Sequence, residues 1–195
     1  MDGRLIEPGP GMENMARRLR LPEWSGMGAE VEDGPGDGVV DIVFGTGDDY
    51  YDDIEPPGIE QLAHVDWLVA NHGALMRDTV LEAALRLWKA HRLHDYDEEE
   101  ETAPPADLTG MAAHVLPMQI HLTTLAGMDV PYVGVRLSAS WNCGHDLGIL
   151  CRGLETVDVT GDQHIDAFRA AELEVEAGGS PGTGLLHDKD GYEVF

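Results

Sequence analysis

Basic residues are scarce in this chain. Its 195 residues include 12 lysines and arginines against 37 aspartates and glutamates, so the formal net charge at pH 7 is −25. A surface this negative repels phosphate backbones, which argues against nucleic acid as a ligand and against anionic membrane surfaces. The same charge attracts basic proteins and divalent cations, although an acidic surface that serves solubility alone has the same composition.

Cysteines and long apolar runs are also few. The two cysteines, Cys143 and Cys151, are typical of a reducing compartment, although their positions in an expected hairpin also allow a disulfide. No stretch approaches the roughly 20 apolar residues that cross a bilayer, and the N-terminus has no apolar segment of a secretory signal. We therefore predict a cytoplasmic protein without a membrane partner.

Glycine and proline divide the chain into three parts. Residues 1–38 are rich in both and hold four of the 12 basic residues, which predicts an N-terminal arm of loops with one short strand around Trp24. We expect residues 39–177 to form a single domain and residues 178–195 to form a C-terminal loop and tail. A basic arm can dock on the acidic domain or on a second subunit, so a homo-oligomer is one expectation.

Hydrophobic periodicity predicts helices in the middle of the chain. Apolar residues recur at mostly three- and four-residue spacings over residues 59–71, and Gly73 offers a C-cap for this helix. A longer helix is predicted over residues 74–94, and a short one over residues 107–114.

Strand patterns lie on both sides of these helices. Residues 39–44 are β-branched and aromatic, residues 118–122 and 131–139 alternate, and two short apolar runs follow at residues 149–151 and 156–159. Consecutive strands joined by turns predict an antiparallel meander. The predicted fold class is therefore α+β, an antiparallel β-meander with a helix pair packed on one face.

The turn after the strand at residues 131–139 combines four side chains of chemical interest, Trp141, Asn142, His145 and Asp146. A neighbouring carboxylate favours the protonated imidazole, which makes His145 a candidate general base or ligand. In the structural alternative, Trp141 fills the interface between sheet and helices and His145 hydrogen-bonds the turn backbone. No nucleophile or second ligand accompanies the histidine, which favours the structural alternative.

The order of elements over roughly residues 39–162 resembles a bacterial family of uncharacterised domains. That family is marked by a strand followed by a Trp-Asp-x-Glu-His-Gly-x-Gly turn, and residues 141–148 of this chain are Trp-Asn-Cys-Gly-His-Asp-Leu-Gly. The tryptophan, the histidine and the last glycine match. Asparagine, glycine and aspartate replace the family's Asp, Glu and first Gly, which removes the acidic partners of the histidine. The resemblance implies the fold and carries no activity.

A second group of candidates lies at the end of the long helix. His91, His94 and Asp95 follow an i, i+3, i+4 spacing, which places them on one helix face and suits a metal ion. Further donors are available at His64, His114 and His121. His91 also continues the apolar stripe of its helix, and a hydrogen-bonded histidine near a helix C-terminus is common. We therefore predict no cofactor.

Three functions agree with these features. The first is a non-catalytic binding protein whose acidic surface engages a basic partner, with the electrostatically steered association typical of bacterial immunity proteins. The second is a metal-assisted hydrolase that uses His145 or the pair His91 and His94. The third is a structural or oligomeric role. The lack of a complete catalytic set favours the first.

Overall fold

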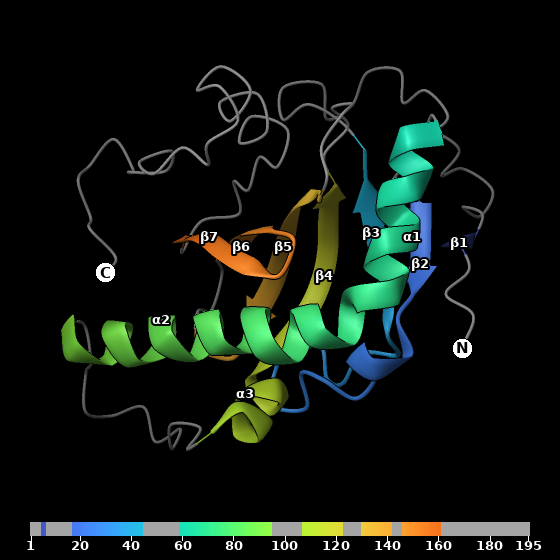
Figure 1. Ribbon diagram of the computed structural model, residues 1–195. Coiled ribbons are helices and arrows are strands. Elements are labelled where there is room, and N and C mark those ends of the chain that lie inside the picture. The colour runs from blue at the N-terminus through green and yellow to red at the C-terminus, as the bar shows by residue number, and fades with distance from the viewer. Residues whose placement is uncertain are drawn as a thin grey trace.

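In the part of the chain that the structure describes, seven strands form one sheet whose spatial order is the order of the chain (Figure 1). The structure, a computed structural model, describes residues 5–6, 17–44, 59–94, 107–122, 130–141 and 146–160. The strands are β1 (Leu5–Ile6), β2 (Arg17–Arg20), β3 (Val39–Val43), β4 (Val115–Leu122), β5 (Tyr132–Ala139), β6 (Leu147–Arg152) and β7 (Glu155–Thr160). The helices are η1 (Pro22–Trp24), α1 (Ile59–Ala74), η2 (Leu75–Val80), α2 (Leu81–His94) and α3 (Leu108–His114).

All neighbouring strands pair antiparallel except β3 and β4. These two are parallel over three residue pairs, Asp41 with Gln119, Ile42 with Ile120 and Val43 with His121. A parallel pair requires a crossover connection, which the helices between β3 and β4 supply. The fold is therefore α+β with a mostly antiparallel sheet, as predicted, and the parallel pair joins β3 to the edge of the antiparallel meander β4 to β7.

The two long helices are continuous in the chain rather than separated by a cap. The predicted helix end at Gly73 is wrong, because α1 passes directly into the π-helix η2 and then into α2. Figure 1 shows the helix changing direction sharply between α1 and α2. Wider π turns disturb the regular hydrogen bonding of a helix and accompany such bends. At this bend the indole Nε1 of Trp24 donates to the carbonyl oxygen of His72 at 3.1 Å.

Gly73 lies within the continuous helix, close to the carboxylate end of Glu23. The Glu23 side chain is exposed and flexible, so it can move aside for a Cβ atom at position 73. Glu23 belongs to the 3₁₀ helix η1, where a strand around Trp24 was predicted. That prediction is also wrong, because Pro22 starts a helical turn in which its fixed φ and missing N–H are tolerated. The strand of this region lies at β2, earlier in the chain.

The core cluster contains side chains of the helices and of alternate positions along the strands. Val133, Val135 and Leu137 alternate along β5 and belong to the buried core cluster, together with Leu68 of α1 and Trp88 of α2. Helix α1 contacts β4, and α2 contacts β6 and β7. Side chains at the intervening positions of the strands therefore lie on the second face of the sheet.

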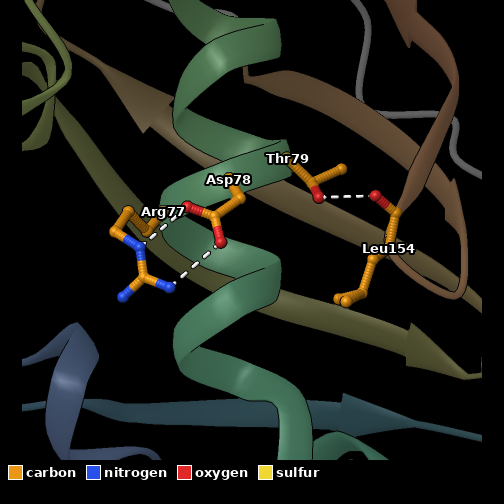
Figure 2. Close-up of polar contacts among 4 residues, drawn as sticks. All are labelled: Arg77, Asp78, Thr79 and Leu154. Atoms are coloured by element: carbon orange, nitrogen blue, oxygen red, sulfur yellow. Dashed lines mark hydrogen bonds and ion pairs between the residues drawn. The ribbon is translucent and has the colours of Figure 1, made fainter.

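The π-helix η2 is hydrogen-bonded to the turn between β6 and β7. Thr79 is 3% exposed, and its Oγ1 donates to the carbonyl oxygen of Leu154 at 2.7 Å (Figure 2). On the exposed part of η2, Arg77 donates from Nε and Nη2 to the two carboxylate oxygens of Asp78 at 2.7 and 3.0 Å. The hydrogen bond from Arg77 lowers the pKa of Asp78.

Replacing Thr79 with Val keeps the shape of the side chain and removes its hydroxyl. The carbonyl of Leu154 then loses its donor, so we expect the free energy of unfolding to fall by about 1–2 kcal/mol in urea denaturation. Thr109→Val, at an exposed threonine of α3, is the matched control and should change stability by less than about 0.5 kcal/mol. Equal stability of the two variants would show that the hydroxyl of Thr79 contributes nothing.

The loop after η1 packs tightly on β4. Gly28 has a φ of +81°, and its amide donates to the carbonyl of Ala112 at 2.9 Å. A Cβ atom at Gly28 would lie 2.8 Å from the Cβ of Leu116. Gly26 has a similar φ of +84° but nothing within 4 Å of a Cβ atom. The two glycines therefore differ in how closely they are packed, but both have a positive φ angle.

This pair separates steric clash from backbone strain. We expect Gly26→Ala to cost about 1 kcal/mol, because alanine is strained at positive φ. Gly28→Ala adds the clash with Leu116, so we expect a cost of about 2–4 kcal/mol in the same urea experiment. A cost for Gly28→Ala no larger than that for Gly26→Ala contradicts the packing of this loop on β4.

Candidate functional site

The two described ends of the predicted functional turn lie on opposite sides of the sheet. Trp141 packs against the core, where its ring centroid lies 4.9 Å from that of Trp88. Asp146 accepts hydrogen bonds from the guanidinium of Arg136, which lies on the second face. Asn142 and His145 lie outside the described residues, so a catalytic role for the turn stays a prediction.

The predicted metal donors lie on separate elements. His91 and His94 occupy the last turn of α2, and Asp95 and both of their side chains lie outside what the structure describes. Nδ1 of His114 is 2.8 Å from Oγ of Ser140. Within the described ranges, no group of three histidine, cysteine, aspartate or glutamate side chains is arranged to hold a metal ion.

Cys151 is fully buried on the core face of β6. Burial raises the pKa of its thiol to about 12. Cys143 lies outside the described residues, so the pairing of the two cysteines is not tested. A buried thiol with this pKa is a weak nucleophile at neutral pH.

A row of polar side chains crosses the second face of the sheet. Arg18, Asp41, Gln119 and Arg136 occupy paired register positions on four consecutive strands, β2 to β5. Nε of Arg18 donates to Oδ1 of Asp41 at 3.2 Å, and both side chains are about half exposed. At the other end, the ion pair of Arg136 with Asp146 is 30% and 21% exposed. This row is accessible on the sheet face opposite the core.

A hollow of about 440 Å³ adjoins the row where β2, β3 and the start of β4 meet. The parallel pairing of β3 with β4 begins only at Asp41 and Gln119, and β4 is irregular between Pro117 and Gln119. Pro117 also has no N–H to donate to a neighbouring strand. The two strands therefore leave space at this end. Four charged side chains of both signs line it, Arg18, Arg20, Asp37 and Asp41.

Asp37 holds the rim of the hollow together. Its Oδ1 accepts from the amide of Val39 at 2.9 Å, and its backbone carbonyl accepts from Nη1 of Arg20 at 3.3 Å. The carboxylate of Asp37 lies 3.8 Å from Nη2 of Arg20, with side chains 70% and 50% exposed. Arg18 therefore pairs with a carboxylate of β3, and Arg20 with a carboxylate of the loop that precedes β3.

Sequence patterns did not single out this row or the hollow. The alternation in β2 and β3 places arginines and an aspartate on one face, but it does not show which strands become neighbours. The pairing of Asp41 with Gln119 joins positions on either side of the whole helical crossover. The available signal was the charge alternation in Arg18, Leu19 and Arg20, which is typical of a strand with one exposed face.

The negative charge is distributed unevenly between the described residues and the rest. The described residues contain 14 of the 37 acidic and nine of the 12 basic residues, which gives them a net charge of −5. The remaining 23 acidic and three basic residues carry −20.

The chain matches no family model, and comparisons with curated proteins and with solved structures find no similar protein. Among the helices that the structure describes, none combines the length and apolar composition required to span a bilayer.

The thiol of Cys151 gives a test of core burial. In a Cys143→Ser variant, we expect Ellman's reagent at about pH 8 to label Cys151 about a thousandfold more slowly than free cysteine, because little thiolate is present. Denaturant should restore ordinary labelling. The folded thiol keeps its proton up to about pH 12 while the unfolded thiol ionises near 9.0, so its contribution to stability falls as the pH rises between these values. Rapid labelling without denaturant contradicts the burial.

Proposed function

We propose that this protein is a non-catalytic binding protein of the bacterial cytoplasm that engages a basic protein partner. The observation that carries the proposal is the net charge of −25, to which residues 95–101 contribute six carboxylates. Excess charge of one sign accelerates encounter with an oppositely charged partner.

The arrangement of the sheet supports a contact surface on its second face. We propose that α1 and α2 form a helix pair that covers one face, because α1 contacts β4, α2 contacts β6 and β7, and their apolar side chains share one core cluster. The exposed ion pairs of Arg18 and Arg20 lie on the other face. A rim of accessible polar side chains is typical of transient protein interfaces.

Two further proposals follow from the sequence. The resemblance of residues 141–148 to the turn of a bacterial family of uncharacterised domains suggests a shared fold. Of the two docking modes expected for the basic N-terminal arm, docking on the same chain is favoured, since Arg18 and Arg20 pair with Asp41 and Asp37 of the same chain.

Association with a partner from the source organism's lysate tests the proposed function. Immobilised protein should retain a basic protein at about 50 mM NaCl and release it at about 500 mM, because salt screens surface charges. With the purified partner, we expect the association rate constant to fall about tenfold or more over this range, while the dissociation rate constant changes less.

The acidic run at residues 95–101 provides a variant with a matched control. Changing its six carboxylates to the corresponding amides should slow association at low salt. A variant with the same seven residues in a scrambled order keeps the charge and should associate as the unaltered protein does. The proposal is wrong if no basic partner is retained at low salt, or if association is insensitive to salt and to the amide substitutions.

A further inference from the structure

We infer that the hollow between β2, β3 and β4 is a binding site for a small zwitterion with an apolar body, an α-amino acid with an apolar side chain. This site goes beyond the proposed function, because it takes a small molecule and does not depend on a basic protein partner. Its volume of about 440 Å³ lies in the range of small-molecule pockets.

The arginines of the hollow supply donors for a carboxylate. Arg18 uses only its Nε toward Asp41, so within the described part of the chain its two terminal nitrogens make no hydrogen bond. Arg20 points two nitrogens at Asp37, one at 3.3 Å from the carbonyl oxygen and one at 3.8 Å from the carboxylate. A guanidinium with unused terminal nitrogens is suited to a planar carboxylate.

The aspartates of the hollow supply acceptors for an ammonium group. Oδ1 of Asp41 accepts from Arg18, which leaves its second oxygen available among the described contacts. Asp37 is 70% exposed and holds its Arg20 partner only at 3.8 Å. Exposed ion pairs of this kind contribute little to stability, so their members exchange partners at small cost. Two cations and two anions on one rim together match a ligand that carries both charges.

The floor of the hollow is apolar. Val39, Leu116 and Met118 line it between the charged side chains, and Met118 is 41% exposed. The flexible thioether of methionine adapts to ligands of different shape. A few charged groups that orient a ligand, set around an apolar lining, are typical of small-molecule sites.

Titration with L-leucine followed by nuclear magnetic resonance tests the inference. We expect saturable shifts of the Met118 methyl signal and of the amides of Val39 and Asp41 at ligand concentrations up to about 10 mM. Leucinamide lacks the carboxylate and N-acetyl-leucine lacks the ammonium group. Each analogue should bind at least about tenfold more weakly than leucine, since each loses one set of charged contacts.

Two substitutions and their controls assign the binding to the hollow. Arg18→Gln and Asp41→Asn should each weaken leucine binding about tenfold or more, with unchanged amide spectra elsewhere. Arg86→Gln and Glu82→Gln, at exposed positions of α2, remove the same charges and should leave binding unchanged.

Three outcomes overturn the inference. The first is that leucine, methionine and phenylalanine all fail to give saturable shifts at the hollow. The second is that leucine and leucinamide bind equally well. The third is that the Arg18→Gln and Arg86→Gln variants bind leucine equally well. Equal binding of leucinamide would mark the hollow as a site for peptide N-termini. Failure of leucine with retained salt-dependent partner association removes this site only, and the reverse pattern removes the proposed function only.

Discussion

The parallel pairing of β3 with β4 is the contact on which the remaining architecture depends. It joins a three-stranded antiparallel unit, β1 to β3, to a four-stranded antiparallel meander, β4 to β7. Because the two strands run in the same direction, the chain must return to the starting end of the sheet, and the segment that contains α1, η2, α2 and α3 makes this crossover. The same pairing is only three residue pairs long and begins at Asp41 and Gln119. The residues that precede these two in β3 and β4 do not pair with each other, and they line the hollow.

The bend of the crossover helix is held by contacts from both of these units. From the first unit, Trp24 donates to the carbonyl of His72, and Glu23 approaches the backbone at Gly73. From the meander, the turn after β6 accepts the hydroxyl of Thr79. Helix direction is thus set by side chains distant in sequence, which places α1 and α2 over different strands of the sheet.

The hydrophobic pattern within each segment was sufficient to predict most helices and strands. It was insufficient to predict where one helix ends and which strands pair. Period-two alternation located β5, and three-to-four spacing located both arms of the long helix, because these signals arise from each segment's own buried face. Gly73 has the local character of a helix cap, but the helix continues past it into η2. Similarly, the side chains from Arg18 to Arg136 become neighbours only when the strands pair in this register. The amino-acid composition does not predict that register. Trp141 follows β5 and packs against the core, whereas Asp146 precedes β6 and pairs with Arg136 on the second face, so the two described residues of the candidate turn do not form one site.

The sequential strand order also bears on how the chain folds. Every strand of the sheet neighbours the strand next to it in the chain, and all junctions but one are antiparallel and close in sequence. Such local pairings form with small loop-closure cost, whereas β3 and β4 are separated by the entire crossover. The antiparallel units therefore have a kinetic advantage, and the joining of the two across β3 and β4 is the step that carries the highest entropic barrier. In a ribosome-bound chain, this step waits until the crossover and β4 have been synthesised.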